Sequence, residues 1–256
     1  MFCILIFVST ILYKSLDTNR ILCYNIKCKE KANQRRRERP KMGKNVYSLV
    51  LSDDVVAAVD RMAYMKGLSR SGMINELLAS AVSYTTPEMW IRTVISKIEG
   101  GLGSGTFIQM QSGANAYSMR SALAYKYNPS LRFSVELYRN RERADTVGEI
   151  KISLRSRSAE LILLLIKFFG LWQTVESAYL PSVEYLFNDG KIIRSLKPSD
   201  PEASAEETGD SIGRFAVCVN KAIEAYFTSY DRESDATEKR LREICAEYYK
   251  SGKITV

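Results

Sequence analysis

Histidine is absent from this 256-residue sequence, and cysteine is scarce. Without histidine, His-based acid–base catalysis, Ser–His and Cys–His nucleophile pairs, and zinc sites with histidine ligands are excluded. The five cysteines show no C-x-x-C spacing, and three of them lie within the first 28 residues. Cys218 and Cys245 fall in helical patterns, which indicates small buried apolar side chains in a reducing compartment. We therefore expect neither an enzyme nor a bound metal or cofactor.

A hydrophobic run long enough to cross a membrane is also missing. A spanning helix needs about 20 consecutive apolar residues, and the run from Phe2 to Tyr13 is much shorter. The apolar segment from Leu161 to Trp172 contains Lys167 and Gly170, which favours a buried helix of a globular core. The sequence predicts no membrane-spanning segment, and it contains no internal repeat.

Basic residues concentrate in residues 1–41, so the net charge of +8 says little about the rest of the chain. Residues 1–41 hold ten Lys or Arg against three Asp or Glu, whereas residues 42–256 hold 27 against 26. The Arg-rich stretch 34–41 lies directly before Met42. Arg, Glu and Lys can all be encoded by purine-only codons, and a purine-rich stretch just before a start codon resembles a bacterial ribosome-binding site. We interpret 1–41 as a doubtful leader outside the native protein, which would start at Met42. The alternatives are a membrane-proximal anchor and a basic arm that follows phosphates.

The clearest local pattern covers residues 45–84 and predicts one strand followed by two helices. Residues 46–51 alternate as a strand, and Ser52 can cap a helix over 53–66. Gly67 ends that helix, and Ser69 begins a second helix that extends to about Tyr84. A unit with one strand cannot bury its own apolar face, so it needs a partner.

The two faces of the predicted strand differ in character. Tyr47, Leu49 and Leu51 form the face that would pack on the helices, while Val46, Ser48 and Val50 point the other way. Lys44 precedes them on that second face. The apolar stripes of the two helices are core or dimer-core residues. They comprise Val55, Val56, Val59, Met62 and Ala63 in the first helix and Ile74, Leu77, Leu78, Ala81 and Val82 in the second.

The second helix begins with Ser69-Arg70-Ser71-Gly72, a sequence suited to binding an anion. Its free N–H groups, the positive end of the helix dipole and the Arg70 charge would all attract a phosphate. The simpler interpretation, which the sequence leaves open, is that Ser69 is only an N-cap.

Taken together, Tyr47–Asp53 and the turn Met65–Ile74 resemble the ribbon-helix-helix family of DNA-binding proteins, of the CopG/Arc/MetJ type. The resemblance covers about residues 44–84. It implies an intertwined homodimer whose two strands form a ribbon in the major groove of double-stranded DNA. By position, it implies base contacts from Lys44, Val46, Ser48 and Val50, and phosphate contacts from Ser69, Arg70 and Ser71.

The sequence departs from the family pattern in its groove-facing residues. Valine can contact only thymine methyl groups, and serine is an undiscriminating hydrogen bonder. Residues 42–86 also balance four basic with four acidic residues. We therefore expect one dimer to bind weakly, so that affinity requires several adjacent dimers or a deformable A·T-rich site.

Beyond this unit, the sequence predicts a connecting helix, a hinge and a second domain. Thr86 and Pro87 begin a helix to about Glu99, and the glycines of 100–105 form the hinge. Residues 106–256 read as an α+β domain of two β-hairpins (131–138 with 149–155, and 183–187 with 191–196) and about three helices (161–179, 211–230 and 235–249), with a surface loop at 197–210. The predicted segments are a leader 1–41, a ribbon-helix-helix domain 42–86, a connector 87–105 and an α+β domain 106–256.

The overall expectation is an α+β protein that regulates transcription. It would be a cytoplasmic, bacterial, sequence-specific DNA-binding protein that acts as a dimer or a higher-order assembly. Its C-terminal domain would take a small ligand or a protein partner. The alternative is an antitoxin-like interaction or oligomerisation module, whose N-terminal unit dimerises without strong DNA binding.

Overall fold

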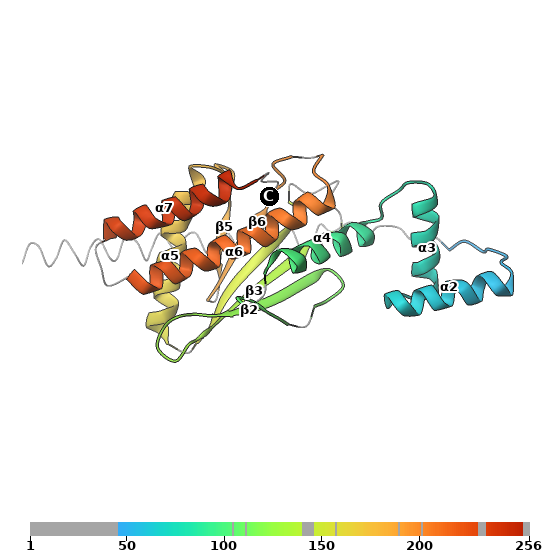
Figure 1. The fold of residues 1–256 in the computed structure, drawn as a ribbon, viewed down its shortest axis with the longest axis horizontal. Helices are drawn as coiled ribbons and strands as arrows, with labels where there is room; N and C mark the ends of the chain where they lie inside the picture. Colours follow the sequence, from blue (N-terminus) through green and yellow to red (C-terminus); the bar gives the residue numbers. More distant parts are fainter. Residues whose placement is uncertain are drawn as a thin grey trace, which may run out of the picture.

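The computed structural model describes residues 46–252, apart from residues 104, 111, 140–145, 157, 189, 201 and 230–233. Within these residues the chain forms six helices and six strands, which confirms the α+β class (Figure 1). The helices are α2 (Asp53–Lys66), α3 (Arg70–Ala81), α4 (Pro87–Gly101), α5 (Ala159–Ser177), α6 (Ala205–Ser229) and α7 (Ser234–Lys250). The strands are β1 (Ile108–Gln109), β2 (Ala116–Ala122), β3 (Ser130–Leu137), β4 (Gly148–Arg155), β5 (Tyr185–Asn188) and β6 (Lys191–Leu196). The proposed leader and Lys44 lie outside the described residues.

All described strands belong to one antiparallel sheet with the order β1-β2-β3-β4-β6-β5. Both predicted hairpins, β3–β4 and β5–β6, are confirmed. Gly190 adopts the positive φ of +71° that the tight turn between β5 and β6 requires. The sequence did not reveal that β4 pairs with β6, which joins the two hairpins into a single sheet.

Two strands of the sheet were missed by the sequence analysis. β1 and β2 pair antiparallel with each other, and β2 pairs along its whole length with β3. The sequence of β2, Ala-Tyr-Ser-Met-Arg-Ser-Ala, contains no β-branched residue, so its composition gave little strand signal. Its pairing with β3, rather than its own propensity, makes it a strand.

One face of the sheet holds the main hydrophobic core. Along β3, Leu131, Phe133, Val135 and Leu137 are fully buried, and the residues between them are exposed or partly exposed. In Figure 1, α4 and α6 run across the same side of β2 and β3. α5 and α7 join the same core, in which Trp172 and Phe215 are fully buried. The opposite face of the sheet therefore carries the polar side chains.

Helix α4 belongs to this core rather than to a connector. Trp90, Ile91, Val94 and Ile98 are buried in the main cluster, and α4 packs along α6. Close approach occurs at Gly209 of α6, where an added Cβ would lie 2.6 Å from the Val94 carbonyl oxygen. Because α4 contributes to the core, the C-terminal unit begins at Pro87, before the glycine segment predicted to be a hinge.

Helix α6 begins earlier than predicted. Residues 205–210 were expected in a surface loop, and they form the first turns of α6. The Glu207 N–H donates to Ser204 Oγ at 3.1 Å, and the Ser204 N–H donates to Glu207 Oε2 at 2.9 Å. This reciprocal capping box fixes the start of the helix, and its Ser-x-x-Glu spacing is visible in the sequence.

Residues 46–52 belong to neither a helix nor a strand in the single chain described. The predicted strand at 46–51 is therefore not formed within one copy of the protein. A search of the described residues finds no helix that is both long and apolar enough to cross a lipid bilayer.

Candidate functional site

The turn between α2 and α3 has the geometry that the sequence predicted. Gly67 ends α2 in the left-handed conformation, with φ of 63°, and its N–H donates to the Tyr64 carbonyl oxygen at 3.2 Å. The next N–H, that of Leu68, donates to the Ala63 carbonyl oxygen at 2.8 Å. Any residue with a Cβ would be strained at Gly67, so the glycine sets the angle at which α3 leaves α2.

Ser69 caps α3, as expected. Its hydroxyl oxygen accepts from the Gly72 N–H at 3.2 Å, and Ser71 Oγ lies 3.3 Å from Ser69 Oγ. Of the six helices in the described ranges, only α3 has no acidic residue in its first turn. No carboxylate of α3 itself therefore offsets the positive end of its dipole, and Arg70 lies in its first turn.

Arg70 has a partner that the sequence analysis did not identify. Its Nε and Nη2 donate to Asp60 Oδ1 and Oδ2 of α2 at 2.7 and 2.6 Å. Hydrogen bonding by the Arg70 guanidinium lowers the pKa of Asp60 from its usual value. Both side chains are exposed, so an anion can reach Arg70, but it would compete with Asp60 for the same donors.

The described residues assigned to base contacts are all exposed. Val46, Ser48 and Val50 are exposed in the single chain, and Lys44 lies outside the described residues. Tyr47, Leu49 and Leu51, assigned to the inner face, are also exposed, although each is less exposed than Val46 or Val50. No side chain of residues 46–52 is buried in the single chain described.

Exposed apolar side chains concentrate in residues 46–84. Twelve of the 17 large exposed apolar residues in the described chain lie there. The twelve are Val46, Tyr47, Leu49, Val50, Leu51, Val55, Tyr64, Met65, Leu77, Leu78, Val82 and Tyr84. By contrast, the core shared by α2 and α3 consists of only three buried residues, Val59, Ala63 and Met73. Residues 46–84 therefore expose many apolar side chains and bury only a small hydrophobic core.

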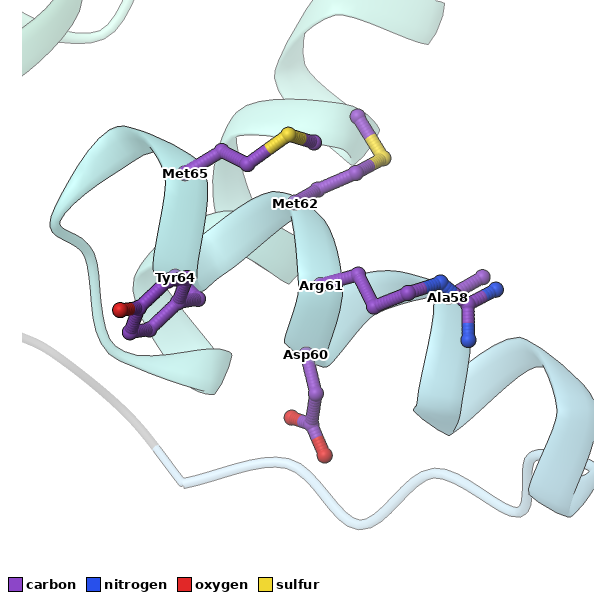
Figure 2. A pocket seen from close by; sticks show the side chains of 6 residues that line it. All are labelled: Ala58, Asp60, Arg61, Met62, Tyr64 and Met65. Carbon is purple, nitrogen blue, oxygen red and sulfur yellow. The ribbon is translucent and has the colours of Figure 1, made fainter.

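A surface hollow of about 640 Å³ lies against α2, and all of its lining residues belong to that helix. In Figure 2, Met62 and Met65 point to one side of the helix and Asp60 points to the other. The hollow is open space beside an incompletely packed helix rather than an enclosed pocket. In Figure 1, α2 and α3 lie at one end of the molecule, beyond α4.

Glu76 of α3 links this unit to the C-terminal domain. Its Oε1 lies 2.7 Å from Arg92 Nη1 of α4, and its Oε2 lies 3.6 Å from Lys66 Nζ of α2. Although charged, Glu76 is buried. The Glu76 carboxylate therefore links α2, α3 and α4.

A second buried ion pair lies within the C-terminal domain. Glu176 of α5 and Arg194 of β6 are fully buried, and Arg194 Nη2 donates to Glu176 Oε1 at 2.8 Å. Tyr185 donates to Glu176 Oε2, and Tyr249 donates to Oε1 at 3.2 Å. Burial alone would lower the pKa of Arg194, but attraction to Glu176 raises it above its ordinary value.

Glu176 and Arg194 are both fully buried, so we interpret the arrangement around them as structural. Neither of the two surface hollows described for this chain includes Glu176 or Arg194. A search of the described residues finds no cluster of His, Cys, Asp and Glu that could hold a metal ion. Cys218 and Cys245 are both buried, as the sequence predicted, and neither forms a disulfide.

Comparisons with family models, curated proteins and solved structures return no match to this chain.

Proposed function

We propose that the protein is a cytoplasmic DNA-binding regulator that works as a dimer through its N-terminal strand-helix-helix unit. The observation that carries this proposal is the exposed apolar surface of residues 46–84 beside the start of α3, whose first turn contains no acidic residue. The surface requires a covering partner, and the helix start attracts an anion. Together these features fit a dimer that grips a phosphate backbone.

In the proposed dimer, residues 46–51 of two copies pair as an antiparallel ribbon. Tyr47, Leu49 and Leu51 would turn inward onto the helices of both copies, and Leu77 and Leu78 would become buried. Val46, Ser48 and Val50, with Lys44, would face the major groove. Ser69, Arg70 and Ser71 at each α3 start would then meet the flanking phosphates.

Dimerisation is tested by replacing two leucines, one at a time, with aspartate. Leu78 on α3 and Leu163 on α5 are 56% and 52% exposed, and only Leu78 lies in the proposed dimer surface. We expect the wild-type protein and Leu163→Asp to have twice the chain mass in light scattering after size exclusion. Leu78→Asp should give a monomer. A wild-type monomer at all concentrations, or equal effects of both changes, would contradict the dimer.

DNA binding is tested by breaking the Arg70–Asp60 ion pair from each side. If Arg70 contacts phosphate, Arg70→Ala should weaken binding to all sequences and lower the salt dependence by about one ion per Arg70. Asp60→Asn should strengthen binding, because it releases Arg70 from its competitor. If the ion pair were only structural, the two changes would act in the same direction, and the proposed phosphate contact would be refuted.

The groove-facing side of the ribbon is tested by sequence preference. Ser48→Ala should alter the bound sequence in a selection from random duplexes and leave the salt dependence unchanged, since it removes a base contact without removing charge. An unchanged preference would place the wrong face of residues 46–51 in the groove.

A protein-interaction module is the second candidate, and the full exposure of Val46 and Val50 favours it. Apolar side chains on both faces of residues 46–51 suit a partner chain that wraps the segment as well as they suit thymine methyl groups. Co-purification from the native host distinguishes the two: a stoichiometric partner protein without bound DNA fragments would support this candidate over the regulator.

A further inference from the structure

The polar face of the sheet carries a row of basic residues across four strands. Arg120 of β2 lies directly opposite Arg132 of β3, Arg132 lies opposite Ser153 of β4, and Ser153 lies opposite Lys191 of β6. Neighbouring strands are about 4.8 Å apart, so the row extends over roughly 14 Å. All three cations are exposed.

This row borders a surface hollow of about 420 Å³, within the usual range for small-ligand sites. Arg155, from the end of β4, lines the same hollow and adds a fourth cation. Ser130, Ser153 and Ser156 supply hydroxyl groups, and none of the described lining residues is acidic. Met110, Leu154 and Ile162 form an apolar part of its wall.

The first turn of α5 also borders the hollow, through Ile162. Ser158 caps this helix by accepting from the Leu161 N–H at 3.3 Å, and Ser156 Oγ accepts from the Ser158 N–H at 3.1 Å. The positive end of the α5 dipole therefore adds to the four side-chain charges. Glu160 lies in the same turn but does not line the hollow.

In the part of the chain that the structure describes, the cations at the hollow lack the ion pairs that a neighbouring lysine on the same sheet face forms. That lysine, Lys151 of β4, lies 2.6 Å from Glu136 Oε2 and 2.7 Å from Glu149 Oε1. At the hollow, Arg120 and Arg132 stand opposite each other, an arrangement that like charges disfavour. Among described residues, none of the four cations forms an ion pair, and Arg132 has one long hydrogen bond, of 3.5 Å to Ser118.

We infer that this hollow binds a small ligand carrying two or more phosphate groups, of about the size of a nucleotide. Four cations and a helix N-terminus offset the charge of a polyphosphate, and three hydroxyl groups can donate hydrogen bonds to it. The mutual repulsion of Arg120 and Arg132 is relieved when it binds. The apolar wall accommodates a base or another uncharged portion. The site lies in the C-terminal domain and is independent of whether residues 46–84 bind DNA.

Isothermal titration of the full chain with ATP, and separately with tripolyphosphate, tests this inference. Arg132→Gln, in the centre of the row, should raise the dissociation constant about tenfold, the loss expected for one charge-assisted contact. Arg155→Gln provides a second, independent variant. Lys239→Gln on α7 is the matched control, since Lys239 is exposed and its loss changes the net charge equally. It should leave binding unchanged within about twofold.

Binding of either probe that both hollow variants weaken, and the control does not, would support the site. Tighter binding of ATP than of tripolyphosphate would support a role for the apolar wall, and equal affinity would assign recognition to the phosphates. Absence of binding by both probes, or binding insensitive to Arg132→Gln and Arg155→Gln, would overturn the inference. It would equally be overturned if only a short duplex oligonucleotide bound at this hollow, which would make the hollow a nucleic-acid surface.

Discussion

The buried Glu176–Arg194 pair makes a sharp prediction about stability. Glu176→Gln keeps the size of the side chain but removes its charge, so Arg194 would remain buried without a counter-ion. Arg194 is anchored over the Phe215 ring, with its Cζ 4.3 Å from the ring centroid, and cannot turn easily toward water. Removing one partner of a buried pair costs about 3–5 kcal/mol.

The size of the effect is measured by urea unfolding and by thermal melting followed through tryptophan fluorescence. At about 2–4 °C per kcal/mol for a domain of this length, the melting temperature should fall by roughly 6–20 °C. The control is Glu238→Gln, which removes an exposed (i, i+4) ion pair with Arg242 on α7. That change should alter stability by less than about 0.5 kcal/mol.

A double substitution separates a buried-charge penalty from the loss of other contacts. Glu176→Gln with Arg194→Met removes both charges and should be more stable than Glu176→Gln alone, because no charge is left unpaired. The reasoning is refuted if Glu176→Gln costs under about 1 kcal/mol, or if the double variant is less stable than the single one.

Three further predictions concern packing and the domain junction. Gly209→Ala should destabilise the protein by about 1–3 kcal/mol in urea unfolding, because the added Cβ would meet the Val94 carbonyl oxygen. Gly170→Ala has open space around it and should stabilise the protein by up to about 1 kcal/mol. Changes of the same sign in both variants would contradict the packing of α4 on α6. Burial raises the pKa of the Cys245 thiol to about 12, so alkylation mapped by mass spectrometry should reach this thiol at pH 8 only after unfolding; labelling of the folded protein would count against its burial. Glu76→Gln should speed amide hydrogen exchange in α3 but not in β3, and a uniform change would show that Glu76 does not hold α3 in place.

The sequence revealed the elements that carry strong local signals. The Gly67 stop, the Ser69 cap and the β5–β6 turn follow from turn and capping chemistry. The helices of the C-terminal domain follow from their apolar patterns, although α6 begins at Ala205 and not at Ser211 as predicted. β2 was missed because its strand character comes from pairing with β3, and its own residues do not favour a strand. The sequence predicted α4 as a connector because a Gly-rich segment follows it. A helix packed in a core can be followed by such a segment as well, and α4 is packed in the main core.

The charged contacts of the sites were the least predictable part. Asp60 and Arg70 are ten residues apart, and the angle set by Gly67 brings them together. The basic row depends on a four-strand register that places Arg120, Arg132 and Lys191 in one line across the sheet, with Ser153 between Arg132 and Lys191. Such juxtapositions require the tertiary fold, since each residue on its own resembles an ordinary solvated charge.

The three-residue core between α2 and α3 has a consequence for how the protein would respond to its own abundance. In the proposed dimer, the N-terminal unit gains most of its core from the second copy, so the element that meets DNA is assembled in a second-order reaction. Where unpaired chains predominate, halving the chain concentration lowers the paired form about fourfold. Operator occupancy would then fall more steeply than protein level, so dilution by cell growth would itself act as a signal.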